Sequence, residues 1–186
     1  MFPHLKAIPV FDLDQFIVDL RATLPGRSRQ ALKQVVARAV ADPTALRRGL
    51  GGPACAGIRV LHSAADLTVL DVVWAANQVT LPHNHQMSAV IGMYAGREDN
   101  LFWRRTPHAA KYQIEAAGGE ALGPGDVTLL GRDVIHSVIN PLGKLSAALH
   151  IYDGDFLGMA RSMWDAETLK EAPYDITTVL KGMAVQ

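Results

Sequence analysis

The chain has 186 residues, which suits a single domain, and 49% of them are apolar, enough to fill a core. The 18 Lys and Arg residues balance 18 Asp and Glu residues, so no excess of positive charge points to binding of nucleic acid or of an anionic membrane. Cys55 is the single cysteine, which excludes an internal disulfide and favours a reducing compartment. The N-terminus lacks the apolar run of a signal peptide and no stretch is long enough to span a membrane. We therefore expect a cytoplasmic protein.

Residues 1–52 have the pattern of a helical N-terminal segment. The first apolar stripe has helical spacing, with Asp12 or Asp14 as the start and Pro25-Gly26 as the end. A second helix is expected over 28–41, and Asp42-Pro43 opens a short third one. Gly51-Gly52-Pro53 then marks a change of architecture.

Short strands with regular turns follow, which is typical of an antiparallel sandwich or barrel. We predict a β-barrel over 57–152, an all-β core within a single domain of residues 1–186. Residues 153–186 form a C-terminal extension with weak helix candidates at 156–164 and 166–171. Gly118-Gly119 is expected to be a turn. The first strand starts near Ile58, and the others are expected at 67–74, 80–85, 88–94, 101–105, 112–114, 127–130, 134–139 and 145–152.

The most informative motif is His83-Asn-His85, followed about fifty residues later by His136. Side chains two apart on a strand point to the same face, so His83 and His85 can aim both imidazoles at one point. With His136 on a neighbouring strand, the three nitrogens would leave coordination positions open. Such a site is typical of a catalytic metal, because structural zinc sites usually close all four positions. The plainer interpretation is that these are turn or surface histidines.

Several other polar residues have simpler interpretations. Glu98 and Asp99 are expected at a solvated hairpin tip, and Asp126 follows a Pro-Gly turn and is expected to cap backbone amides. Trp74 is expected in the core. His62 either lines a pocket or, more simply, has its hydrogen bonds satisfied elsewhere in the core or at the surface.

The two histidine segments resemble the two short motifs of the cupin superfamily. The first motif matches His83-Asn-His85 with Gly96, and the second matches Pro124-Gly125-Asp126 with His136 to Asn140. The resemblance implies a double-stranded β-helix, a jelly-roll-like barrel. Many cupins add a Glu ligand four or five residues after the second His, where this chain has Ala89 and Val90. The implied site therefore has three histidines and no carboxylate.

The stretch from about Arg59 to Tyr152 also resembles the cysteine dioxygenase family of thiol dioxygenases. Trp74 lies nine residues before His83, as in that family, and Ala148-Leu-His150-Ile-Tyr152 matches the family's Ser-x-His-x-Tyr segment. The family's Ser is replaced by Ala148, so the Ser-His-Tyr relay lacks its outer member. Val90 stands where some animal members carry a cross-linked cysteine.

The resemblance implies roles for particular residues. His83, His85 and His136 would hold the metal, expected to be Fe(II), although three imidazoles also suit Ni, Mn or Zn. Tyr152, oriented by His150, would be catalytic; the alternative is a buried Tyr-His pair that only supports packing. Arg59 would bind a substrate carboxylate with two parallel hydrogen bonds. An exposed strand arginine is the alternative, and the rivals for the carboxylate are Arg97, Arg104 and Arg105.

The implied partners are a small thiol and dioxygen, with no nucleic acid and no membrane. Three neutral imidazoles leave a divalent charge uncompensated, which favours an anionic ligand such as a thiolate. The expected reaction converts cysteine or 3-mercaptopropionate to its sulfinate. Two other functions remain open: a three-histidine cupin dioxygenase that cleaves a diketone, and a non-catalytic cupin that binds a metal or a small ligand.

Overall fold

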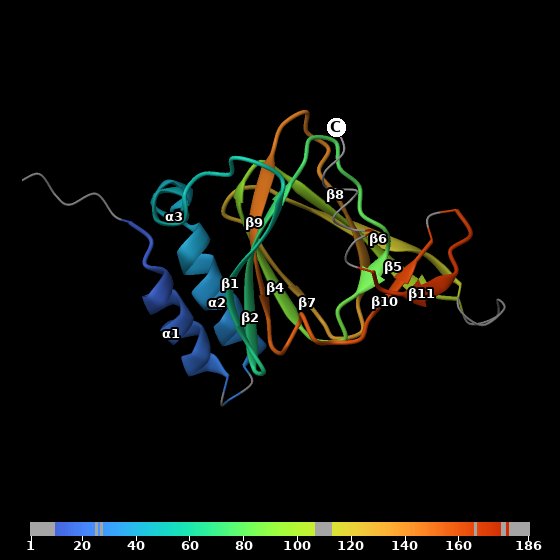
Figure 1. Cartoon of the computed structure of the whole chain (residues 1–186), viewed down its shortest axis with the longest axis horizontal. Coiled ribbons are helices and arrows are strands. Elements are labelled where there is room, and N and C mark those ends of the chain that lie inside the picture. Colours follow the sequence, from blue (N-terminus) through green and yellow to red (C-terminus); the bar gives the residue numbers. More distant parts are fainter. Residues whose placement is uncertain are drawn as a thin grey trace, which may run out of the picture.

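The computed structural model describes residues 10–24, 26, 28–106, 113–165, 167–175 and 178 (Figure 1). Its N-terminal helices begin where the sequence predicts, because a capping side chain precedes each one. Asp12, Ser28 and Asp42 each accept a hydrogen bond from a backbone N–H of the first turn. The helices are α1 (Leu13–Thr23), α2 (Arg29–Val40) and α3 (Pro43–Leu50). None of the helices in these described ranges is long and apolar enough to cross a membrane.

The rest of the described chain forms two antiparallel sheets, and the helices lie against one of them (Figure 1). The first sheet has the order β1-β2-β9-β4-β7. Its strands are β1 (Gly57–Ala64), β2 (Leu67–Trp74), β9 (Ser146–Tyr152), β4 (Ala89–Ala95) and β7 (Val127–Leu130). The second sheet has the order β11-β10-β3-β8-β5-β6. Its strands are β11 (Glu171–Pro173), β10 (Ser162–Trp164), β3 (His83–Asn84), β8 (Ile135–Ile139), β5 (Glu98–Arg105) and β6 (Ile114–Leu122). This architecture confirms the predicted double-stranded β-helix class with an N-terminal helical segment.

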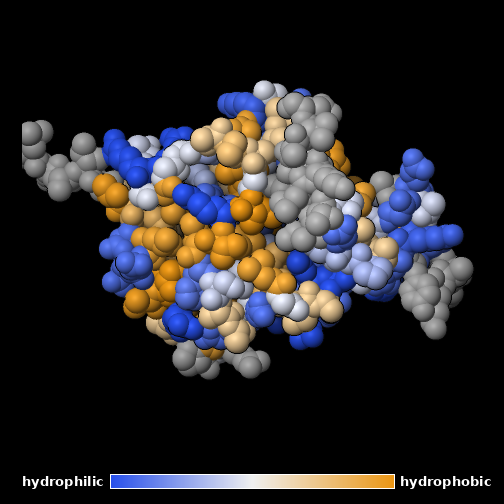
Figure 2. All heavy atoms as spheres, viewed as in Figure 1, coloured by the Kyte–Doolittle hydropathy of each residue, from blue (hydrophilic) through white to orange (hydrophobic). Residues whose placement is uncertain are grey.

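Strands β2, β4 and β9 of the first sheet are buried on both faces, which explains their nearly unbroken apolar sequences. On β2, Val69 and Val73 belong to the core shared with the helices, whereas Leu70 and Val72 belong to the core between the sheets. Helix α2 approaches closely: a Cβ at Gly92 of β4 would lie 2.5 Å from Val36 Cγ1. Figure 2 shows apolar side chains gathered over the half of the molecule that carries the helices and the first sheet, and hydrophilic ones over the end with β10 and β11.

The strand expected at 80–85 is reduced to β3 (His83–Asn84), and two further predictions of secondary structure differ from the structure. The expected turn at Gly118-Gly119 lies inside β6, where a register shift opposite Phe102 and Trp103 accommodates Gly118 at a φ of 140°. Glycine tolerates this backbone conformation, so the strand continues past it. Residue 112 of the expected 112–114 strand lies outside the described residues.

The C-terminal helix candidates are the second difference. The described part of 156–171 contains β10 instead, and β11 begins at Glu171. The reason is the short β3, whose open edge would leave backbone groups unpaired. Met163 pairs with His83, and the Trp164 N–H donates to the Pro82 carbonyl at 2.8 Å. The extension therefore completes the second sheet beside the histidine motif.

Candidate metal centre

The three predicted histidines converge between the sheets. His83 lies on β3 and pairs in register with His136 on β8, and His85 follows β3. All three are buried, and one nitrogen of each lies within 4.8 Å of those of the other two. Among the described residues, no carboxylate joins this group. The alternative of surface histidines is therefore excluded by burial.

Hydrogen bonds fix the tautomers of two of these histidines. His83 Nδ1 lies 2.9 Å from the Leu81 carbonyl, an obligate acceptor, so Nδ1 carries the proton. His136 Nδ1 lies 2.6 Å from Asn100 Oδ1, also an acceptor. Both Nε2 atoms are therefore unprotonated and carry a lone pair. His136 Nε2 is 3.1 Å from His85 Nε2. Nitrogens with converging lone pairs and Nδ1–H groups held by oxygen acceptors are what metal-binding histidines require.

Burial keeps these imidazoles neutral. It lowers the pKa of His83 to about 4, even though the Leu81 hydrogen bond acts the other way. Burial, and then the neighbouring imidazoles, lower the pKa values of His85 and His136 well below the usual range. Neutral imidazole is the form that binds a metal. The donor set, its tautomers and its charge state therefore fit a divalent metal ion.

His150 and Tyr152 lie on β9 and line the same cavity as the three histidines. His150 Nδ1 lies 3.2 Å from the Tyr152 hydroxyl. The Tyr152 ring packs edge-on against His85, with centroids 5.1 Å apart. Burial raises the pKa of Tyr152, so its hydroxyl stays protonated. The structure therefore brings both predicted catalytic residues to the histidine group.

Glu98 is a functional candidate that the sequence pattern did not predict. The expectation of a solvated hairpin tip is wrong for this residue, because Glu98 is 0% exposed. Its carboxylate accepts hydrogen bonds from Trp74 Nε1 at 2.7 Å and from Asn100 Nδ2 at 3.0 Å, and His150 Nε2 lies 3.5 Å away. The period-2 pair Glu98 and Asn100, placed on one face of a strand, was the signal that could have revealed it. Trp74 is core, as expected, and also lines the cavity.

The structure does not bring Arg59 to the histidine group. Arg59 Nη2 donates to Asp71 Oδ2 at 2.7 Å and to the Leu50 carbonyl at 2.8 Å, on the face of the sheet that meets the helices. Its neighbour Ile58 lines the histidine cavity instead. The rivals are also engaged in ion pairs, which are Arg97 with Asp99, Arg104 with Glu115 and Arg105 with Glu171.

A different guanidinium adjoins the site. Arg161 is stacked between the rings of Phe156 and Tyr174, at 3.8 Å and 4.1 Å from their centroids. Phe156 in turn stacks on Tyr152. Arg161 Nε and Nη1 are buried without a hydrogen-bond partner among the described residues, although the side chain contacts Tyr174. Burial lowers the pKa of Arg161 from its ordinary value. No sequence pattern marked this residue, because it follows the strands that carry the motifs.

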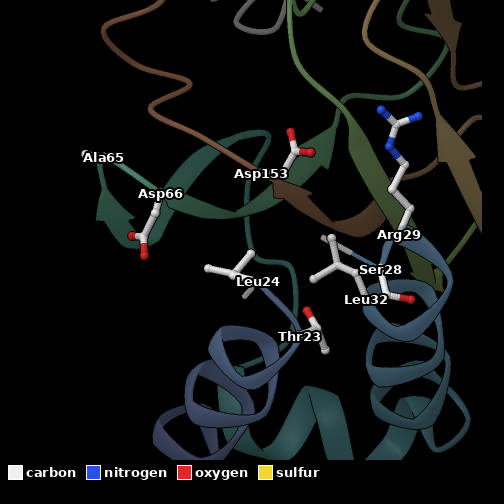
Figure 3. A pocket seen from close by; sticks show the side chains of 8 residues that line it. All are labelled: Thr23, Leu24, Ser28, Arg29, Leu32, Ala65, Asp66 and Asp153. Atoms are coloured by element: carbon white, nitrogen blue, oxygen red, sulfur yellow. The ribbon is translucent and has the colours of Figure 1, made fainter. Parts of the chain in front are cut away.

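The cavity at the histidines is small, about 30 Å³, with Phe156 and Tyr174 in its wall. A larger hollow of about 310 Å³ lies where the end of α1 and the start of α2 face Asp66 and Asp153, whose side chains Figure 3 shows. Its described lining residues include no imidazole. The chemistry therefore points to the smaller cavity as the functional site.

No family model matches the chain. Among solved structures, it is similar to a variant of oxalate decarboxylase from Bacillus subtilis, with 14% identity and a TM-score of 0.39, over 50% of this chain and 22% of that one. It is also similar to KdgF from Halomonas sp., with 15% identity and a TM-score of 0.42, over 52% and 76% of the two chains. A conserved protein with a double-stranded β-helix domain from Klebsiella pneumoniae shows 10% identity and a TM-score of 0.42, over 66% and 86%. This chain thus spans less than a quarter of the decarboxylase.

Proposed function

We propose that this protein is an iron(II)-dependent dioxygenase that oxidises a small thiol carboxylate, such as cysteine or 3-mercaptopropionate, to its sulfinate. The reaction combines R–SH with O₂ to give R–SO₂H, so both oxygen atoms end on sulfur and no further reductant is needed. The observation that carries the proposal is the buried, all-imidazole group of His83, His85 and His136. The resemblance of the His150–Tyr152 segment to thiol dioxygenases selects this reaction among those of three-histidine sites.

The charge of the donor set supports a thiol substrate. Three neutral imidazoles leave a divalent ion's charge uncompensated, which favours an anionic ligand, and a nearby cation lowers the pKa of a thiol. Bound iron(II) would supply the activation of dioxygen. The aromatic and aliphatic cavity wall, with Trp74, Val72 and Phe156, would exclude water from the reacting sulfur.

For the substrate carboxylate, we propose Arg161 in place of Arg59. Arg161 Nε and Nη1 are buried without hydrogen-bond partners in the described chain, so the guanidinium has N–H donors left for a substrate carboxylate. Stacking between Phe156 and Tyr174 holds the guanidinium plane in one orientation. Tyr174 also lies against His83, with ring centroids 5.7 Å apart, so this wall borders the metal ligands.

Tyr152 would orient the substrate with its hydroxyl oxygen, and His150 holds that hydroxyl in place. A cavity of about 30 Å³ leaves room for about one water molecule. Substrate binding would therefore require part of the cavity wall to move, and we propose that Phe156 and Tyr174 are that part.

Oxygen uptake by iron-loaded protein tests the proposal. The substrates are cysteine, 3-mercaptopropionate, cysteamine and acetylacetone in parallel, with mass spectrometry after reaction under ¹⁸O₂. We expect uptake with a thiol carboxylate and a product that gains two labelled oxygen atoms. The His136→Ala variant is the matched control and should take up no oxygen.

Two results would contradict the proposal. Uptake with acetylacetone alone would favour a diketone-cleaving dioxygenase. No uptake with any of the four compounds, in protein shown to hold iron, would favour a non-catalytic binding function.

A further inference from the structure

We infer that the buried Glu98 carboxylate is a positioning residue that fixes the tautomers of both His136 and His150, and so orients a metal ligand and the Tyr152 hydroxyl together. The link to Tyr152 rests on the proposed function, whereas the tautomers do not.

The placement of Glu98 is the first argument. Its side chain is completely buried on β5, and among the described residues no Lys or Arg pairs with it. A buried carboxylate is costly unless hydrogen-bond donors surround it. Trp74 and Asn100 are those donors, and His150 Nε2 is the third polar group nearby. An ionised carboxylate only accepts, so every group facing it must turn a proton toward it.

The first branch leads to the metal ligand. Asn100 Nδ2 donates to Glu98 Oε1 at 3.0 Å, which fixes the orientation of the amide and directs Oδ1 toward His136. His136 Nδ1 lies 2.6 Å from that oxygen and must donate to it. The His136 proton therefore sits on Nδ1 and Nε2 is free to bind metal. Two hydrogen bonds thus connect Glu98 to this ligand.

The second branch leads to Tyr152. His150 Nε2 faces Glu98 Oε2 at 3.5 Å, which is longer than a normal hydrogen bond but favours a proton on Nε2. His150 Nδ1 is then the acceptor for the Tyr152 hydroxyl at 3.2 Å. The Tyr152 proton points to His150, and the oxygen lone pairs are left for the cavity. Ala148 has no hydroxyl to bond with His150. The Glu98 carboxylate, from the facing sheet, therefore takes the place that the serine has in the Ser-His-Tyr relay of the thiol dioxygenases.

The experiment measures tautomers rather than turnover. Imidazole ¹⁵N NMR of the metal-free wild type should show His136 protonated at Nδ1 and His150 protonated at Nε2. Glu98→Gln, which keeps the shape but can turn a donor toward either neighbour, should shift His150 toward the Nδ1–H form. It should also weaken zinc binding by about 10- to 100-fold, as loss of an outer partner of a metal ligand does.

Two further variants separate the branches. Asn100→Ala should weaken zinc binding and leave the His150 tautomer unchanged. Glu115→Gln, an exposed glutamate of β6 paired with Arg104, is the matched control and should change neither. Thermal unfolding establishes that each variant is folded.

A wild-type His150 protonated at Nδ1 would overturn the inference even if Glu98→Gln failed to fold. A folded Glu98→Gln protein with unchanged tautomers and unchanged zinc affinity would overturn it as well. Failure of the proposed thiol oxidation would leave these measurements unaffected, because none of them uses activity.

Discussion

The Arg59 guanidinium lies 2.7 Å from the Asp71 carboxylate, on the face of β1 and β2 turned away from the three histidines. Tyr94 donates to the other oxygen of Asp71 at 2.6 Å, and Arg59 also donates to the Leu50 carbonyl at the end of α3. Asp71 is buried, whereas the Arg59 side chain is 52% exposed. This cluster joins the helical segment to the first sheet, so the contacts of Arg59 point to stability.

Arg59→Ala should therefore reduce the free energy of unfolding by about 1–3 kcal/mol, because the buried Asp71 loses one of its two side-chain partners. Urea unfolding measures this. KM for a thiol carboxylate should remain unchanged. A large rise in KM with unchanged stability would return Arg59 to the substrate site.

Arg161→Ala should instead raise KM for thiol carboxylates. The loss in kcat/KM should be about 2–4 kcal/mol, roughly 30- to 1,000-fold, as for removing one partner of a buried charged pair. The preference for thiol acids over cysteamine should disappear, because cysteamine has no carboxylate. Steady-state kinetics with both substrates measures this.

Arg97→Ala is the matched control for this experiment, since Arg97 is half-exposed and paired with Asp99. It should leave KM and the substrate preference as they are. A folded Arg161→Ala enzyme with full selectivity would reject Arg161 as the carboxylate-binding residue.

Metal binding should follow the histidine group. We expect about one divalent ion per chain, and His83→Ala and His136→Ala should each abolish high occupancy in metal analysis. Added metal should also stabilise the wild type against unfolding, by about 4 kcal/mol at a free concentration of 1,000 times Kd. His62→Ala removes a histidine of β1 that lies outside the group. This variant should keep both the metal occupancy and the stabilisation by added metal. Full occupancy in both ligand variants would place the metal elsewhere.

Tyr152→Phe should lower kcat roughly 100-fold with little change in KM, because it removes one hydroxyl that acts on the reacting groups. Tyr94→Phe is the control, since its hydroxyl binds Asp71 on the far face of the sheet. Ala148→Ser should leave the metal content unchanged and alter the rate only through His150 and Tyr152. A rise in KM with unchanged kcat for Tyr152→Phe would contradict a catalytic role.

The local features of this fold could be predicted from the sequence. Asp12, Ser28 and Asp42 are N-caps as expected, because capping depends on residues within one turn. Asp126 accepts from the Gly123 N–H in its Pro-Gly turn, as expected. His83 and His85 converge as expected, although β3 ends at Asn84 and His85 follows it.

Features set by distant pairing could not be predicted. The strand at 162–164 exists because β3 needs a neighbour, and nothing in its own sequence indicates that need. The same holds for the face on which a residue lies. Arg59 and Ile58 are adjacent, and the register with β2 decides which of them meets the cavity. Glu98 looked solvated because the burial of its strand depends on contacts with β8 and the facing sheet.

The stability of the metal-free protein should depend on pH. Burial lowers the pKa of His83 to about 4 and lowers the pKa values of His85 and His136 well below their usual range, whereas each titrates near 6.5 in an unfolded chain. Between these values the unfolded chain binds more protons than the folded one, so stability rises with pH. The contribution of the neutral histidines to the free energy of unfolding is complete above pH 6.5 and is lost as the pH falls toward 4.

Metal-free protein should therefore lose stability between pH 6.5 and 4, with His83 alone contributing on the order of 3 kcal/mol by pH 4. For Glu98, burial acts to raise the pKa, but the contacts with His150, Trp74 and Asn100 outweigh it and lower the pKa. Ionised Glu98 therefore stabilises the folded protein above the pKa of an unfolded glutamate. This stabilisation is lost as the pH falls, as is that of the three histidines. Urea unfolding at pH 7, 6, 5 and 4 measures the slope. His83→Ala should reduce that slope, and saturating zinc should shift the loss to lower pH, because protons then compete with the ion for Nε2. A flat profile between pH 7 and 5 in metal-free protein would mean that the folded histidines take up protons normally, and the neutral donor set would be lost as an argument for the metal centre.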